Sequence, residues 1–161
     1  MTEYFYIITV ISITGGGIVT GLLFAFSNFV MRALDDLQPE HGMFAMQRIN
    51  EKIINPIFLI LFLGTPLLCL AIVIATATNL NNPGNILLFV GAISYLIGPF
   101  GITMLFNVPL NNELAHAAPS DAKEVWPSYR KTWQRWNHIR TYIGIFSVAT
   151  LAFGLAVTNG P

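Results

Sequence analysis

Charged residues are scarce in this sequence: Asp, Glu, Lys and Arg make up 10% of its 161 residues, whereas soluble domains carry about 25%. The eight positive and eight negative charges cancel, so the chain lacks the basic balance of a nucleic-acid-binding surface. Cys69 is the only cysteine, which excludes a disulfide framework and a cysteine-rich zinc site. Hydrophobic residues, in contrast, make up 54% of the chain. This composition excludes a water-soluble domain and predicts a membrane protein.

Two long stretches contain no charge at all. No Asp, Glu, Lys or Arg occurs between Glu3 and Arg32, or between Lys52 and Glu113. A helix needs about 20 apolar residues to cross the hydrocarbon core, so the first stretch holds one span and the second holds two. A fourth span follows Arg140. The predicted fold is all-α, an integral membrane four-helix bundle that forms a single domain over residues 1–161, with spans at about 4–30, 53–78, 86–106 and 139–157.

The two longer connections between the spans are predicted to be helical as well. Residues 43–55 carry apolar side chains at helical spacing, which predicts an interfacial helix before span two. In the second connection, large aromatic residues recur at steps of three and four, which predicts a helical extension leading into span four; they are Trp126, Tyr129, Trp133 and Trp136. Two interpretations of these rings stay open. Together with Tyr142 they form an aromatic belt at the headgroup level, or some of them line a pocket for a flat apolar ligand.

All Lys and Arg residues lie in these two connections or at their borders: Arg32, Arg48, Lys52, Lys123, Arg130, Lys131, Arg135 and Arg140. The N-terminal tail, the short turn at residues 79–85 and the C-terminus contain none. By the positive-inside rule, both long connections face the cytoplasm and both termini lie outside. We therefore expect a multi-pass protein of the cytoplasmic membrane.

Polar residues gather at the ends of all four spans that meet these connections. They are Asn28 and Arg32; Asn50 and Asn55; Asn107, Asn111 and Asn112; and Asn137, His138 and Arg140. Amides and charges are costly at membrane depth unless they face the interior of the bundle. If they converge, they form a polar floor beneath an apolar chamber, which is the usual anatomy of a small-molecule site. The alternative is that each asparagine simply caps a helix.

Patterns of metal ligands are weak. Glu113 and His116 have the spacing found in di-iron carboxylate bundles, but those sites need a second copy and further glutamates. His116, His138 and Glu113 are therefore only weak candidates for an interfacial metal site. No histidine pair lies within the spans to hold a haem across the bilayer centre, and we predict no cofactor, although a metal or haem is not excluded.

His138 is the strongest candidate for acid–base chemistry, because its ordinary pKa of about 6.5 makes both protonation states accessible. Arg140 can hold an enolate or phenolate by its charge, and Asn137 can donate a hydrogen bond to a carbonyl.

Three groups of motifs along the chain resemble those of a known family. They are Ala45–Asn50 with Asn55–Phe58, then Asn107–Leu114, and then Trp126–Tyr129 through Trp133 to Trp136–Thr141. In this order and between these spans, they are similar to the anthrone oxygenase family of small four-span membrane proteins, and the likeness covers nearly the whole chain. The resemblance implies that molecular oxygen oxidises an anthrone, a tricyclic phenolic ketone, to an anthraquinone. An anthrone has an acidic methylene, so its carbanion can react with oxygen if a base removes the proton and a cation or amide holds the enolate.

The resemblance and the polar motifs together assign roles to individual residues. The catalytic candidates are His138 as base, Arg140 as counter-charge and Asn137 as an orienting group, and the substrate-binding candidates are Asn50, Asn107, Asn111, Trp133 and Trp136. The expected partners are a lipophilic small molecule and the lipid bilayer, with no nucleic acid; a homo-oligomer or a place in a membrane complex stays open. A function of another class also stays open, namely a non-catalytic membrane subunit or scaffold that binds a lipid, a pigment or partner helices.

Overall fold

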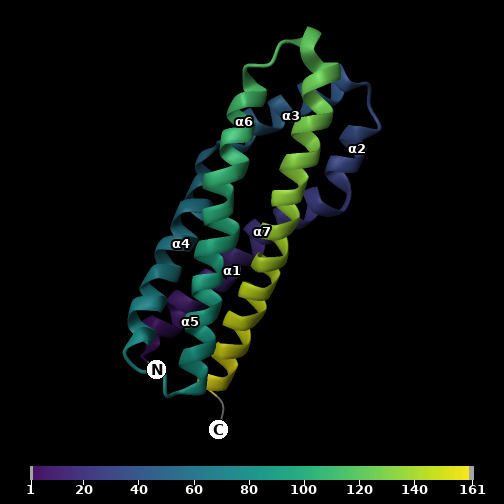
Figure 1. Ribbon diagram of the computed structural model, residues 1–161. Coiled ribbons are helices and arrows are strands. Elements are labelled where there is room, and N and C mark those ends of the chain that lie inside the picture. Colours follow the sequence, from purple (N-terminus) through teal and green to yellow (C-terminus); the bar gives the residue numbers. More distant parts are fainter. Residues whose placement is uncertain (1, 160–161) are drawn as a thin grey trace.

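The computed structural model describes residues 2–159 and is all-α (Figure 1). Its elements are α1 (Glu3–Ala25), the π-helix η1 (Phe26–Val30), α2 (Met31–Asp35), α3 (Pro39–Ile53), α4 (Pro56–Ala77), α5 (Pro83–Tyr95), the π-helix η2 (Leu96–Asn107), α6 (Val108–Ala115), the short 3-10 helix η3 (Pro119–Asp121) and α7 (Ala122–Asn159). Four helical segments are long and apolar enough to cross a membrane: Glu3–Asp35, Pro56–Ala77, Pro83–Ala115 and Pro119–Thr158. The predicted all-α fold with four membrane-spanning helices is confirmed, whereas the orientation in the membrane stays a prediction.

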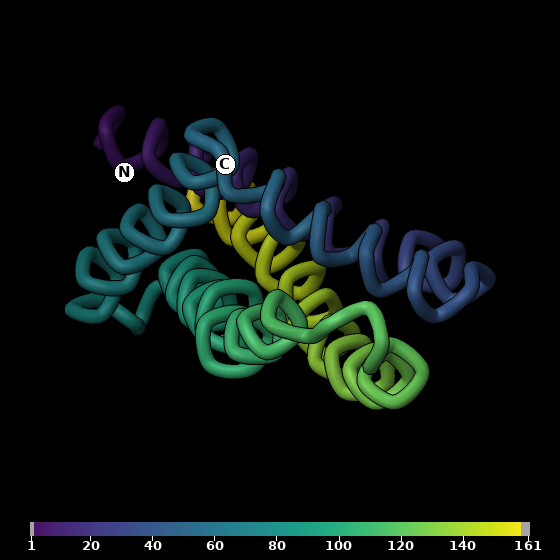
Figure 2. Tube along the Cα trace, turned by 90° about the horizontal axis from the view of Figure 1, so that it is seen from above, coloured from purple at the N-terminus to yellow at the C-terminus, as the bar shows by residue number. Residues whose placement is uncertain are grey.

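The bundle has two distinct ends. Both termini lie at one end, which we call the terminal end (Figure 1). At the other, the connection end, α3 contacts α2, α6 and α7, and the view from above shows it running alongside α2 (Figure 2). Asn55 and Asn82 accept hydrogen bonds from main-chain N–H groups at the starts of α4 and α5. For Asn55, the helix-capping alternative is the observed one.

Side chains at the terminal end pack closely around α7. The buried cluster there consists of Cys69, Ile72, Leu88, Ala92, Tyr95 and Leu151. Gly91 brings the helices together, since a Cβ atom on it would lie 2.9 Å from the main-chain nitrogen of Leu151. The pair Gly17 and Gly21 plays no such part, because added Cβ atoms would meet nothing within 4 Å.

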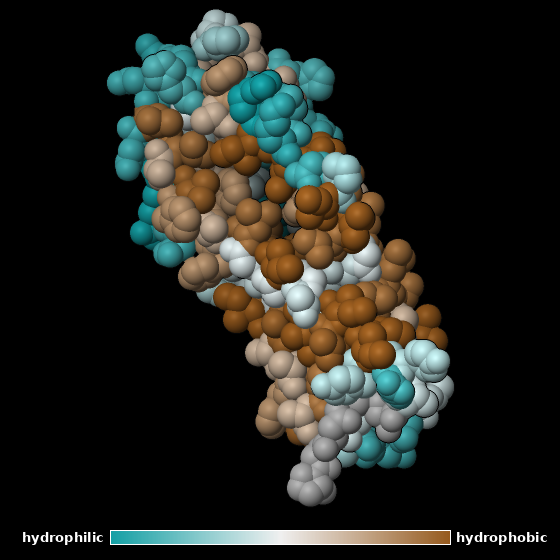
Figure 3. Space-filling model, turned by 180° about the vertical axis from the view of Figure 1, so that it is seen from behind, coloured by the Kyte–Doolittle hydropathy of each residue, from teal (hydrophilic) through white to brown (hydrophobic). Residues whose placement is uncertain are grey.

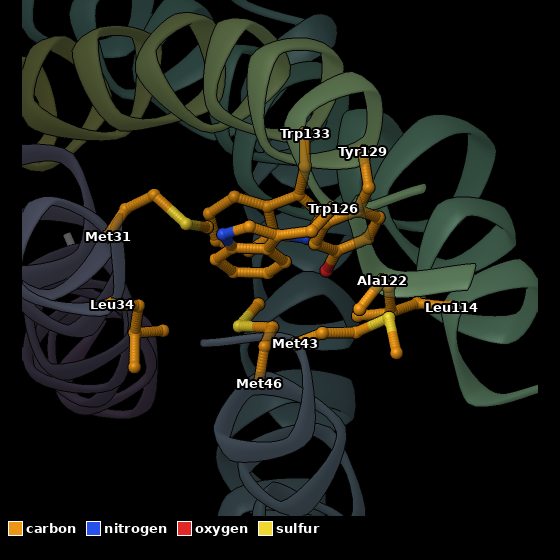
Figure 4. Close-up of a cluster of buried hydrophobic side chains, with 9 residues drawn as sticks. All are labelled: Met31, Leu34, Met43, Met46, Leu114, Ala122, Trp126, Tyr129 and Trp133. Atoms are coloured by element: carbon orange, nitrogen blue, oxygen red, sulfur yellow. The ribbon is translucent and has the colours of Figure 1, made fainter. Parts of the chain in front are cut away.

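A second buried cluster fills the connection end (Figure 4). Met43 and Met46 of α3 lie against the aromatic rings of α7 there. Trp126 is 2% exposed, and Tyr129 and Trp133 are buried as well, so the aromatic-belt interpretation is wrong for these three rings. Tyr142, in contrast, is 70% exposed. The sequence spacing identified the aromatic face of α7 correctly, but α3 covers that face.

The outer surface fits a lipid environment along most of its length. Figure 3 shows hydrophobic side chains over a broad band, with hydrophilic groups gathered toward the two ends. Large apolar side chains of α4 are exposed to the outside, among them Ile57, Ile60, Leu67 and Ile74. Burial of this apolar area needs lipid, because these side chains have no protein neighbours to cover them.

Candidate functional site

A cavity of about 750 Å³ lies at the connection end, between α1, α3, α4, η2, α6 and α7. Its size is within the range of small-molecule sites, about 300–1,000 Å³. Apolar side chains form most of its wall, including Val19, Leu22, Phe26, Phe58 and Phe62. The polar lining residues include Gln47, Asn50, Thr103, Asn111, Asn112 and Arg140. The cavity is thus an apolar chamber with polar groups on part of its wall.

Arg140 is the buried cation of this wall and is only 5% exposed, whereas Arg48, which also lines the cavity, is exposed and pairs with Glu51. Its Nε and Nη2 atoms donate to Asn137 Oδ1 at 3.0 and 2.7 Å, and its Nη1 donates to Thr103 Oγ1 at 2.7 Å. The guanidinium also lies over the Trp133 ring, 5.1 Å from the centroid. All these partners are neutral, and within residues 2–159 no carboxylate pairs with Arg140. A buried charge without a counter-charge is costly, so this position suits an anion that approaches from the cavity.

Asn137 fixes Arg140 on the side away from the cavity. Its Nδ2 donates to the carbonyl oxygen of Leu23 at 3.0 Å and to Ser27 Oγ at 2.8 Å. Leu23 and Ser27 lie at the junction of α1 and η1, and Thr103 lies in η2. Both π-helical segments described above therefore contact the Asn137–Arg140 pair. Single π turns in α-helices frequently occur at functional sites. Asn137 is fully buried and does not line the cavity, so its contacts fix the guanidinium rather than a ligand.

Asn111 lies on the same wall and links two aromatic residues. The Tyr129 hydroxyl and Trp133 Nε1 both donate to Asn111 Oδ1, each at 2.8 Å. Asn50, from α3, lines the cavity too, and its amide nitrogen is buried without a hydrogen-bond partner. Gln47 helps to hold α3 in place, because its Nε2 donates to the carbonyl oxygens of Leu114 and Ala117 at 2.8 and 3.2 Å.

The structure therefore brings four of the predicted site residues to one cavity wall, namely Asn50, Asn111, Trp133 and Arg140, with Asn137 behind them. The other three do not line this cavity. Asn107 is buried and donates to the carbonyl oxygen of Trp133 at 3.2 Å, and Trp136 stacks on Phe106 with ring centroids 3.8 Å apart.

His138 is the third residue outside the wall. Its ring lies 6.4 Å from that of Tyr142, and its buried Nδ1 has no hydrogen-bond partner. The reason is helical geometry: residues two apart do not share a face of a helix, whereas residues three apart do. Asn137 and Arg140 therefore face each other, and His138 points elsewhere despite its place in the same motif.

Of the three weak metal candidates, His138 lies apart from the other two. Glu113 and His116 line a second cavity of about 480 Å³ between α6 and the start of α7, and His138 is not part of its lining. His116 Nδ1 is 2.7 Å from the carbonyl oxygen of Asn112. Over the described part of the chain, no three His, Cys, Asp or Glu side chains gather in a way that could hold a metal ion.

Two residues of the network, Ser27 and Thr103, were not predicted. Both lie in apolar spans, where a hydroxyl can bond its own helix: Thr103 Oγ1, for example, donates to the carbonyl oxygen of Pro99. No signal in the sequence separates such a hydroxyl from one that also accepts a bond from a buried arginine.

Comparison with known proteins gives one family. The family model described as anthrone oxygenase matches residues 58–150, a stretch that includes Asn111, Trp133, Asn137 and Arg140 but not Asn50. No curated protein and no solved structure matches the chain. Because the matched stretch covers more than half of the 161 residues, this chain belongs to the anthrone oxygenase family.

Proposed function

We propose that the large cavity is the active site of a membrane-embedded oxygenase, which oxidises a lipophilic phenolic or quinone-related aromatic with molecular oxygen. The observation that carries this proposal is Arg140, a buried cation on the wall of an apolar cavity, paired only with neutral groups. A guanidinium carries five N–H groups, and three of them donate to Asn137 and Thr103. Two remain for the oxygen atom of a ligand.

An anthrone suits such a site because loss of a proton from its methylene gives an enolate, with the charge on the ketone oxygen. Arg140 holds that oxygen and lowers the free energy of the enolate relative to the neutral ketone. The carbanion carbon then gives an electron to O2, a C–O bond forms, and proton uptake yields a hydroperoxide. Loss of water breaks the O–O bond and leaves a carbonyl, so one methylene and one O2 become one carbonyl and one water.

The walls contribute by excluding water around this charge. Apolar side chains from α1 and α4 line the chamber, and a low dielectric strengthens the interaction between the guanidinium and an enolate. The methylene proton passes in this proposal to the carboxylate of Glu51, an exposed acidic lining residue that is bonded to Arg48. His138 has no part in this proposal because it is not on the wall.

Oxygen consumption tests the proposal directly. The purified protein in detergent is mixed with 1,8-dihydroxyanthrone, and oxygen uptake is compared with the spontaneous rate. The Arg140→Met variant should lose about 100-fold or more of the catalysed rate, the usual loss for one electrostatic contact to an oxyanion. Arg135→Gln is the matched control, because Arg135 is an exposed arginine on the same helix. Wild-type rates in Arg140→Met would contradict the proposal.

A second candidate function is a non-catalytic membrane subunit that binds a lipid or pigment. Two predicted site residues favour it: Asn107 and Asn137 donate to main-chain carbonyl oxygens inside the bundle, as packing residues do. The oxygen experiment separates the two functions. A wild-type protein that binds the anthrone without accelerating oxygen uptake would favour the subunit.

We further propose that the connection end, with the cavity, faces the cytoplasm. Every Lys and Arg lies in the connections that meet there or at their borders, which the positive-inside rule places on the cytoplasmic side. A cysteine introduced at Ser120 should then resist a membrane-impermeant thiol reagent in intact cells and react after lysis.

A further inference from the structure

We infer that Asn111 and Asn50 form a second recognition point, which binds a ligand oxygen on the edge of the aromatic system opposite the oxygen that Arg140 holds. This inference rests on the proposed function, since it concerns the same cavity. Its ligand class is an aromatic ring system with oxygen functions on two opposite edges.

The first support is the fixed orientation of the Asn111 amide. An indole Nε1 can only donate, so the atom of Asn111 that faces Trp133 Nε1 at 2.8 Å is the oxygen. The Tyr129 hydroxyl donates to the same oxygen. The Nδ2 group must then point away from both rings, and it donates to no group in the described chain. Because Asn111 lines the cavity, that NH2 group is available to a ligand.

The second support is Asn50. Its side chain lines the same cavity from α3, beside the Tyr129 hydroxyl; at most one of the two N–H groups on its buried Nδ2 can reach that hydroxyl, so at least one lacks a hydrogen-bond partner. Buried donors are nearly always satisfied in folded proteins. Amide NH2 groups from two helices, α3 and α6, thus have N–H donors without partners on one wall, and such donors need an acceptor oxygen.

The third support is the arrangement around the Trp133 ring. Arg140 lies over the face of this ring, with its guanidinium carbon 5.1 Å from the centroid, whereas Asn111 meets the ring at its Nε1 edge. The cation and the amide are therefore separate points of the wall, each with free donors. In the proposed reaction, the second point receives the edge on which the new carbonyl forms, because the ketone and the methylene of an anthrone lie on opposite edges of the central ring.

Tyr129 is the positioning residue of this second point. It does not line the large cavity, but its hydroxyl bond to Asn111 Oδ1 helps to keep the amide nitrogen turned toward the ligand. Tyr129→Phe removes that bond and keeps the ring. The matched control is Tyr95→Phe, which removes a buried hydroxyl from the terminal-end cluster, remote from the cavity lining.

Binding of anthrone and anthraquinone under nitrogen tests the inference without turnover. The two probes share one frame and differ by the second oxygen, so the ratio of their Kd values in one variant cancels effects of detergent and of partial unfolding. Asn111→Ala should weaken the binding of anthraquinone about tenfold and leave the Kd of anthrone nearly unchanged. The ratio of the anthrone Kd to the anthraquinone Kd should therefore fall about tenfold toward one. Asn50→Ala and Tyr129→Phe should shift the ratio in the same direction, and Tyr95→Phe should leave it unchanged.

The failure of this inference is distinguishable from that of the proposed function. An unchanged ratio in Asn111→Ala and Asn50→Ala, with anthrone still bound and oxygen consumed by the wild type, overturns only the second recognition point. A wild-type protein that binds neither probe overturns both.

Discussion

The two ends of this bundle are packed by side chains of different size. At the terminal end, glycines let α5 approach α7 so closely that a Cβ on Gly91 would lie 2.9 Å from the main chain of Leu151. At the connection end, bulky residues of α3 and α7 meet instead, with Met43 and Met46 against aromatic rings. The large cavity lies beside this second contact. Small residues thus bring α5 and α7 together at the terminal end. At the connection end a close approach of this kind occurs at Gly42, where a Cβ would lie 2.5 Å from the carbonyl oxygen of Leu34, and large side chains lie beside the cavity.

Polar groups follow the same division. At the terminal end, a buried hydroxyl such as that of Ser147 donates to a main-chain oxygen, that of Gly91, at 2.7 Å. At the connection end, a buried cation is held by Asn137 and Thr103 beside open space. The hydroxyl at the terminal end only completes a hydrogen bond within the bundle, whereas the guanidinium at the connection end keeps N–H groups that can donate to a ligand.

The largest effect on stability should come from disrupting the close helix packing at the terminal end. Gly91→Leu forces a side chain into main-chain atoms of α7 and should lower the free energy of unfolding by about 3 kcal/mol, at the upper limit of ordinary overpacking. Gly17→Ala is the control, because its Cβ would meet no atom within 4 Å. Thermal unfolding in detergent measures both variants, and equal midpoints would contradict the proposed difference between the glycines.

The next largest effect should come from Asn137, which accepts hydrogen bonds from the guanidinium of Arg140. Asn137→Ala removes the bonds to Leu23, Ser27 and Arg140 and leaves two buried N–H groups of Arg140 unpaired, at a cost of about 2 kcal/mol. Oxygen consumption should fall more than stability explains, because the guanidinium is no longer fixed. Asn28→Ala, at an exposed position on η1, provides the comparison. A folded Asn137→Ala protein with full activity would show that Asn137 serves packing alone.

A smaller effect on stability, but a large one on binding, should follow from filling the cavity. Leu22→Trp places a larger ring on a lining position, where open space replaces the tight contacts that make overpacking costly. Anthraquinone binding should weaken at least tenfold, while the thermal midpoint stays within a few degrees of the wild type. Unchanged binding in this variant would place the ligand elsewhere.

The smallest effect should come from His138. Because this side chain does not line the cavity, His138→Ala should retain at least about a third of the oxygen-consumption rate, in contrast to about 100-fold loss in Arg140→Met. A loss in His138→Ala that matches the loss in Arg140→Met would restore the histidine as the base.

The fold was largely predictable because long gaps between charges mark spans, and the aromatic spacing of α7 marks a buried face. The site was predictable only in part. Asn137 and Arg140 are three apart on a helix and do meet, whereas His138, the strongest acid–base candidate in the sequence, faces elsewhere. The free donors of Asn111 and Asn50 depend on contacts between α3, α6 and α7, and no local pattern specifies those contacts.

The central claim is that Arg140 holds a ligand oxygen inside the cavity at the connection end. An experimental structure of the protein with anthraquinone bound tests it most directly. The account predicts the ring system between α1, α4 and α7, with one carbonyl oxygen in hydrogen-bond reach of Arg140 and the opposite one facing Asn111 and Asn50. Anthraquinone on the outer apolar surface, with Arg140 bonded only to Asn137 and Thr103, would contradict it.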